Sequence, residues 1–255
     1  MSKVIVTGAT GNGVAILTAA LASPSISQVT VISRRPLYQP DHPKLSTILI
    51  PSDEFPKGFD EFPPSLLELV KDHKRVFGHS ASARRRSTRR IISSKSERGD
   101  KTNDRITHDY PLVAAKALSL LGTPATPFRF IYISGAGTEQ DESGRTLFSK
   151  IKGRTEKALK AMETPSFQTV SLRLGGIVPT AEHGKHMNFW FKTGLNAISS
   201  VFETVYPPFV IPSRDLGLVA AELARANAPR GWEERVSEGW IANKQLRKMA
   251  EEYRK

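Results

Sequence analysis

The chain has 255 residues, no cysteine and a formal net charge of +12 at pH 7. This length suffices for one α/β domain with its own core, and the lack of cysteine excludes disulfides, thiolate catalysis and cysteine metal sites. No run approaches the ~18 apolar residues of a membrane span. A predicted strand begins at once, so we expect no signal or transit peptide. The positive charge invites a nucleic-acid partner, depending on where it lies.

A glycine-rich turn follows the first predicted strand, over 4–7, and precedes a predicted helix that begins near Val14. Glycine leaves no side chain where a phosphate must approach, and the following helix directs its first N–H groups and its positive dipole end there. The pattern predicts a dinucleotide-binding turn in an α/β sheet. The contact residues it predicts are Gly8, Thr10, Gly11, Asn12 and Gly13.

The run Thr7-Gly8-Ala9-Thr10-Gly11 resembles the TGATGxxG opening of the atypical short-chain dehydrogenase/reductase-like proteins. The resemblance implies an NAD(P)-binding Rossmann fold, that is, a doubly wound and mostly parallel sheet in a single domain over 1–255. The small Tat-interacting-protein-like oxidoreductases are the branch it resembles most. The third glycine comes one place early, at Gly13, and Val14 stands where the pattern has glycine. We expect Val14 to crowd the helix against the strand.

A second predicted strand, over 29–32, leads to Arg34 and Arg35. In NAD-specific folds an acid at this distance from the glycine turn accepts the ribose 2′-hydroxyls, whereas an arginine accommodates a 2′-phosphate. No acid is present here, so the sequence favours NADP over NAD, with NAD as the alternative cofactor. A solvated basic turn is the other interpretation of the two arginines.

A third strand is predicted over 44–50 and a helix over 64–70, but no convincing fourth strand follows. Residues 74–104 form a basic low-complexity segment with ten Lys/Arg against three Asp/Glu. One interpretation is a disordered surface insertion, and a second is sequence that is not native coding sequence. The third is a nucleic-acid or nuclear-import arm centred on 84–90, although no aromatic residue is interleaved there for base stacking.

The helical pattern returns with Asp109 as the expected N-cap, and a central strand over 128–137 follows. Ligands in open α/β sheets bind beyond the carboxyl ends of the strands, which places Ser134 over the cofactor. The family resemblance implies that Ser134 contacts the substrate carbonyl or hydroxyl. A turn-capping serine is the alternative interpretation.

The next predicted helix carries Phe148 and Lys152 at the spacing of the Tyr-x-x-x-Lys motif of short-chain dehydrogenases, which places both side chains on one face. The resemblance implies that Lys152 holds the nicotinamide ribose. The tyrosine that would act as general acid is replaced by Phe148, which has no proton to donate. Tyr110 and His108 are candidate substitutes. A solvated lysine is the alternative for Lys152.

The remainder of the chain follows the same family pattern. A strand with a glycine turn is predicted over 169–179, and short strand and helix pairs over 210–224 and 240–250. An apolar helical pattern over 187–206 fits packed core, a cap on a substrate pocket or a membrane-surface helix.

These patterns together predict an NADP(H)-binding oxidoreductase-like protein that acts on a small carbonyl or hydroxyl compound, with Ser134 and Lys152 as its catalytic residues and no metal. A non-catalytic NADP(H)-binding sensor or scaffold is the alternative, favoured by Phe148. We expect a cytoplasmic protein; the family branch makes peripheral contact with the mitochondrial outer membrane the alternative.

Overall fold

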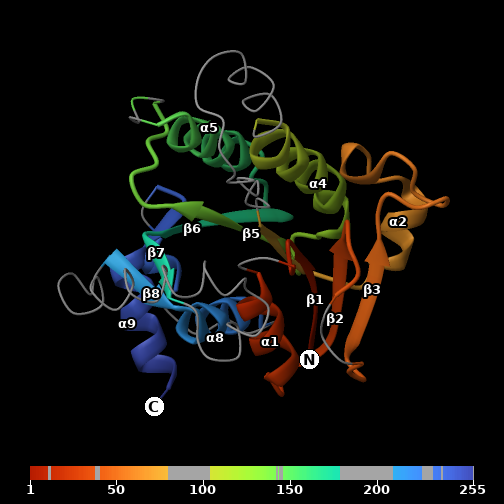
Figure 1. Cartoon of the computed structure of the whole chain (residues 1–255), viewed down its shortest axis with the longest axis horizontal. Helices are drawn as coiled ribbons and strands as arrows, with labels where there is room; N and C mark the ends of the chain where they lie inside the picture. Colours follow the sequence, from red (N-terminus) through yellow and green to blue (C-terminus); the bar gives the residue numbers. More distant parts are fainter. Residues whose placement is uncertain are drawn as a thin grey trace, which may run out of the picture.

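The structure is a computed structural model that describes residues 1–10, 13–37, 41–79, 104–141, 143, 146–178, 209–225, 232–236 and 238–254. A seven-stranded sheet lies between two layers of helices (Figure 1). Its strand order is β3-β2-β1-β4-β5-β6-β9, and every neighbouring pair is parallel. This is the doubly wound arrangement that the sequence predicted, with the order reversing between β1 and β4.

The strands of the large sheet are β1 (Ser2–Thr7), β2 (Ile26–Ser33), β3 (Leu45–Leu49), β4 (Arg75–His79), β5 (Phe128–Gly135), β6 (Phe167–Leu174) and β9 (Trp240–Ala242). Two further strands, β7 (Gly176–Val178) and β8 (Val210–Pro212), form a separate parallel pair. The principal helices are α1 (Val14–Ala22), α2 (Pro64–Leu69), α4 (Tyr110–Leu118), α5 (Leu147–Ala161), α8 (Ser213–Leu223) and α9 (Asn243–Tyr253). Short helical turns are η1 (Gly58–Asp60), η2 (Arg105–Asp109), η3 (Ser119–Leu121) and η5 (Glu233–Arg235).

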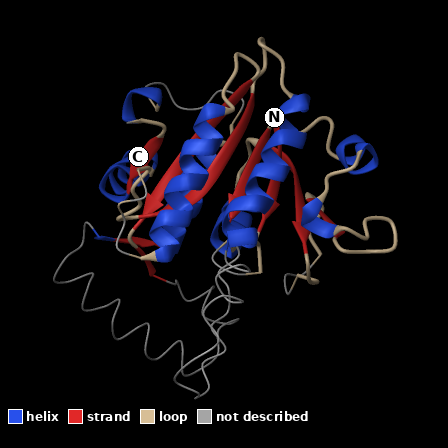
Figure 2. Ribbon diagram, turned by 90° about the horizontal axis from the view of Figure 1, so that it is seen from above, coloured by secondary structure: helices blue, strands red, loops and turns tan. Residues whose placement is uncertain are grey.

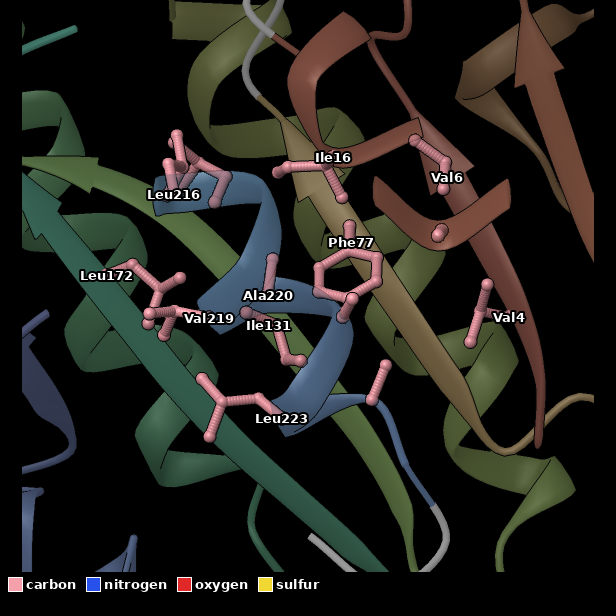
Figure 3. Close-up of a cluster of buried hydrophobic side chains, with 14 of the residues drawn as sticks. Val4, Val6, Ile16, Phe77, Ile131, Leu172, Leu216, Val219, Ala220 and Leu223 are labelled. Carbon is pink, nitrogen blue, oxygen red and sulfur yellow. The ribbon is translucent and has the colours of Figure 1, made fainter. Parts of the chain in front are cut away.

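The core has two halves, one on each face of the sheet. Helices α1, α8 and α9 cover one face, where Phe77 and Ile131 of the central strands pack against Val219 and other apolar residues (Figure 3). Helices α2, α4 and α5 contribute to the core on the opposite face; Figure 2 shows α4 and α5 from above. Central strands buried on both faces read as continuous apolar runs, which is why β1 and β5 were predictable.

Strand β4 corrects the expectation that no fourth strand follows the helix over 64–70. It occupies Arg75–His79, inside the segment 74–104 that the sequence assigned to a low-complexity run. The charged Arg75 interrupts the apolar pattern that indicates a buried strand. Its side chain is nevertheless buried, and its Nη1 donates to the carbonyls of Lys74 and Pro127, both at 2.7 Å. Residues 80–103, including the arginine cluster over 84–90, lie outside the described residues.

The start of α4 also differs from the expectation. Asp109 has helical backbone angles and makes no side-chain capping bond, because the chain is already wound in the π-turn η2 before α4 begins. The backbone carbonyl of Thr107 in this turn accepts hydrogen bonds from the Tyr132 hydroxyl, at 3.0 Å, and from the Thr155 hydroxyl, at 3.1 Å. The turn is therefore fastened both to β5 and to α5.

The buried imidazole of His73, just before β4, predicts a loss of stability in acid. Its Nδ1 donates to the Val70 carbonyl at 3.1 Å, so Nε2 accepts from the Thr30 hydroxyl at 2.9 Å. Burial lowers the pKa of His73 from 6.5 to about 4. As the pH falls, His73 is therefore protonated in the unfolded chain before it is protonated in the folded protein. The stability that the neutral imidazole contributes is complete above pH 6.5 and is lost as the pH falls toward 4. We expect roughly 2–3 kcal/mol of loss from this residue.

Chemical denaturation of the wild type and His73→Gln at several pH values between 7 and 4 tests this assignment. The variant should lose stability less steeply than the wild type over that interval, because glutamine does not titrate. Lys116→Gln, at an exposed position in α4, removes a cation without removing an imidazole and is the control that should keep the wild-type slope. An unchanged slope in His73→Gln would assign the acid sensitivity to other groups.

Candidate cofactor and substrate site

The residues singled out from the sequence come from the loops after β1 and β2, the end of β5 and the helix α5. Because the strands are parallel, the carboxyl ends of β1, β2, β5 and β6 all meet at one edge of the sheet. Three strand spacings separate the ends of β2 and β5, about 14 Å at 4.7–4.9 Å per spacing. This edge can accommodate a ligand extended across the point where the strand order reverses.

The turn between β1 and α1 is tight, and Gly13 is the residue that permits it. Gly8 has a φ of 70°, in the left-handed region that favours glycine. A Cβ on Gly13 would lie 2.8 Å from the Gly8 carbonyl oxygen, inside the backbone of the turn. Val14 is half-buried, and the close approach to the Gly8 backbone at the start of α1 is made by Gly13. Thr10 is exposed, and Gly11 and Asn12 lie outside the described residues.

Arg34 and Arg35 follow β2 at the same edge and are both exposed. The Ser33 hydroxyl shapes their turn, since it donates to the Arg35 carbonyl at 2.8 Å and accepts from the Arg35 N–H at 3.2 Å. Within the described residues, neither guanidinium is paired with a carboxylate. A cavity of about 690 Å³ opens beside them. Its lining comprises Pro36, Leu37, Asp41, His42, Pro43, Leu45, Thr47 and Leu49.

Ser134 lies at the end of β5 and is 3 % exposed. Its hydroxyl donates to the Thr138 hydroxyl at 3.5 Å, a long contact that leaves it free to reorient. Thr138 is 1 % exposed and comes from the loop after β5; no sequence pattern indicates its pairing with Ser134. The two hydroxyls form a small buried polar group below the start of α5.

Lys152 is buried, against the alternative of a solvated lysine. Its Nζ donates to the Ile133 carbonyl at 3.4 Å and lies 4.6 Å from the centroid of the Phe148 ring. The contact confirms that residues 148 and 152 share one face of α5, as the spacing predicts. Burial lowers the pKa of Lys152 from 10.5 to about 8, while the Glu156 carboxylate acts in the opposite direction. Among the described residues, the hydrogen bond of the ammonium is the long one to the Ile133 carbonyl, so the ammonium can donate further hydrogen bonds to a ligand.

The two candidate substitutes for the missing tyrosine have polar and aromatic partners of their own near the start of α4. The Tyr110 ring stacks on Phe59 at a centroid distance of 5.6 Å, with the Arg105 guanidinium over it. His108 Nδ1 lies 2.9 Å from an Asp109 carboxylate oxygen. Phe148, by contrast, stands beside Lys152 with its side chain about half exposed.

Two site residues were missed from the sequence, Glu156 on α5 and Arg173 on β6. They form a buried ion pair in which Arg173 Nη2 lies 2.7 Å from the Glu156 carboxylate. Glu156 follows Lys152 by one helical turn, and the strand register places Arg173 beside Ser134. A charged residue inside the apolar strand over 169–174 was the available signal for this pair.

The helix expected over 187–206 lies outside the described residues. In the described ranges, no group of three or more His, Cys, Asp or Glu side chains is placed to hold a metal ion. No helix among these residues has the length and apolar character needed to cross a membrane.

The fold recurs in solved structures of short-chain dehydrogenases. A short-chain dehydrogenase from Burkholderia cenocepacia in complex with NADP matches 98 % of this chain and 91 % of its own, at 14 % identity and a TM-score of 0.58. The NADPH-dependent 3-quinuclidinone reductase from Rhodotorula rubra matches 96 % and 91 %, at 10 % identity and a TM-score of 0.62. A short-chain dehydrogenase family protein from Francisella tularensis matches 94 % and 96 %, at 13 % identity and a TM-score of 0.61.

No protein-family model and no curated protein matches the sequence. The likeness is therefore one of fold: a single Rossmann-like α/β domain of the kind that short-chain dehydrogenases have. At identities of 10–14 % it extends to the architecture and not to the particular activity.

Proposed function

We propose that this chain binds NADP(H) and transfers a hydride between the nicotinamide and a small carbonyl or hydroxyl compound. The observation that carries the proposal is the β1–α1 turn, where a Cβ on Gly13 would enter the backbone of Gly8. A turn this bare, at the switch point of a doubly wound sheet, lets main-chain N–H groups reach a pyrophosphate. Structural neighbours with NADP in their names support the same cofactor.

Each site residue predicted from the sequence has a role in this proposal. Gly8, Thr10, Gly11, Asn12 and Gly13 cradle the pyrophosphate, and Arg34 and Arg35 receive the 2′-phosphate. Lys152 donates to the nicotinamide ribose, and the Ser134 hydroxyl donates to the substrate oxygen. When bound, the cofactor supplies or accepts the hydride; the protein supplies orientation and hydrogen bonds.

A non-catalytic role in NADP(H) binding is the second candidate, and Phe148 is the observation that favours it. A phenyl ring beside Lys152 offers no proton, so the usual proton source for carbonyl reduction is missing. Sustained NADPH oxidation with a panel of aldehydes and ketones supports the enzyme, whereas NADPH binding without turnover supports the sensor. The proposal includes a cytoplasmic location, with peripheral contact with the mitochondrial outer membrane as the alternative.

The arginine pair predicts a preference between the two dinucleotides. Substituting Arg34→Ser and Arg35→Ser together should weaken NADPH binding about 10- to 100-fold, the range expected for losing hydrogen bonds to a charged group. NADH affinity should stay within about threefold, because NADH lacks the 2′-phosphate. Calorimetric titration of the wild type and the variant with both dinucleotides measures these changes.

The control removes the same charge elsewhere. Lys116→Ser with Lys244→Ser takes two exposed cations from α4 and α9, and should leave both affinities unchanged. Wild-type protein that binds neither dinucleotide while soundly folded would refute the proposed function. If the arginine variant lost affinity for NADPH and NADH equally, Arg34 and Arg35 would not bind the 2′-phosphate, but the rest of the proposed function would stand.

A further inference from the structure

Three buried charges lie together between α5 and the sheet: Lys152, Glu156 and Arg173. Their exposed fractions are 7 % for Lys152 and 2 % for Glu156, and the Arg173 side chain is 12 % exposed. Two cations thus share one carboxylate in a region with little water. Which cation the carboxylate pairs with decides how the other behaves.

Arg173 holds the carboxylate in the structure. Its Nε lies 3.1 Å from each Glu156 oxygen and its Nη2 lies 2.7 Å from one of them. Gln140 Nε2 adds a donor at 3.4 Å. The Arg173 guanidinium also stacks on the Trp240 ring at 4.1 Å, which fixes its plane. This forked contact is stronger and more directional than a lysine can make.

Glu156 is nevertheless within electrostatic range of Lys152. The two residues are four apart on α5, the spacing at which helical side chains meet. The carboxylate raises the pKa of Lys152 against the larger effect of burial, and Lys152 is left near 8. A Glu156 side chain released from Arg173 would have one buried cation within reach, the Lys152 ammonium.

We propose that Arg173 is a positioning residue for Lys152: by holding Glu156, it prevents this carboxylate from capturing the ammonium and keeps the ammonium available to the cofactor ribose. The effect on affinity rests on the proposed function, whereas the effect on Lys152 itself does not. Arg173 lies on β6, where the strand register sets it beside Ser134. Its guanidinium is engaged by the Glu156 carboxylate and the Trp240 ring, so its role is exerted through Glu156.

The test compares Arg173→Met with the double variant Arg173→Met/Glu156→Gln. In Arg173→Met the freed carboxylate should pair with Lys152, raise its pKa toward 10.5 and weaken NADPH binding about tenfold. In the double variant no carboxylate remains, so the pKa should fall to the wild-type value or lower and NADPH affinity should return to within about threefold of wild type. NMR titration of 13Cε-labelled lysines, assigned with Lys152→Met, reports the pKa without ligand, and calorimetry reports the affinity.

If the Arg173–Glu156 ion pair were merely structural, its loss would leave the pKa of Lys152 unchanged. An unchanged Lys152 pKa in Arg173→Met, or a double variant that binds NADPH no better than the single one, would overturn the proposal. If Arg173→Met does not fold, Arg173→Gln retains one hydrogen bond to Glu156 and should give a smaller rise in the same direction. The control Arg225→Met breaks the 2.6 Å Arg225–Glu222 pair and should change neither readout. Wild-type protein without NADPH affinity would refute the proposed function, and the pKa comparison would still decide the role of Arg173.

Discussion

Replacing Gly13 with valine is expected to abolish NADPH binding and to lower the free energy of unfolding by about 1–3 kcal/mol, the usual range for an overpacked site. Any Cβ at this position meets the Gly8 carbonyl oxygen at 2.8 Å and the Gly8 carbonyl carbon at 3.0 Å. Those atoms are main chain and cannot rotate away, so the turn itself must shift. The shift would misdirect the N–H groups at the start of α1.

The matched control lies one residue further on. Val14→Ala removes two methyl groups from a half-buried side chain in the same turn, and should leave NADPH affinity within about threefold of wild type. Calorimetric titration measures the affinities and urea denaturation measures the stabilities. A Gly13→Val protein that binds NADPH as the wild type does would show that the dinucleotide does not use this turn.

Gly13 also shows which features of this turn a sequence pattern can predict and which it cannot. The glycine turn, the buried strands beside it and the sheet class were predictable because short apolar runs and glycine spacing are local properties. The position of the close contact was not: Gly13 sits one place early for the family pattern, and only the path of the backbone shows that it, and not residue 14, faces Gly8.

Strand β4 was missed because the buried Arg75 looks like a surface residue in a sequence. Arg75 on β4 is register partner to Arg129 on β5. Arg129 donates to the Leu223 carbonyl at the end of α8, at 2.8 Å, and stacks on the Trp232 ring at 4.2 Å. Burial lowers the pKa of both guanidiniums, to about 10 for Arg129. Arg75 also donates to the carbonyl of Pro127, and this contact, like those of Arg129, joins segments far apart in the sequence, which no local pattern indicates.

In the candidate site, too, the local features were predictable from the sequence and the contacts between distant segments were not. The spacing of residues 148 and 152 on one helix face is local, and the Phe148–Lys152 contact confirms it. The Glu156 carboxylate that acts on Lys152 is held by Arg173, which comes from another segment, β6. The position of Arg173 depends on the register of β5 with β6, which the sequence alone does not define.

Substituting Lys152→Met should stabilise the protein without ligand and weaken NADPH binding, two effects of opposite sign. A buried ammonium costs stability: lowering the pKa from 10.5 to about 8 corresponds to roughly 3 kcal/mol at neutral pH, where lysine is charged in both the folded and the unfolded chain. Methionine has a similar shape without the charge, so we expect a gain of about 1–3 kcal/mol in the free energy of unfolding. NADPH affinity should fall about tenfold or more, because the ribose loses a charged donor.

The pH dependence of the stability difference between Lys152→Met and the wild type tests this prediction independently. Between pH 8 and 10.5 the unfolded wild type holds the Lys152 proton that the folded protein has released, so wild-type stability rises relative to the variant and the gap between them closes. Denaturation at pH 7, 9 and 10.5 follows the gap, and calorimetry gives the affinities. Lys150→Met, at an exposed position on the same helix, should alter neither quantity. A Lys152→Met protein that is less stable than the wild type would mean that the lysine holds the fold together; one that is more stable and binds NADPH poorly shows an amine kept buried, at the expense of stability, for a ligand.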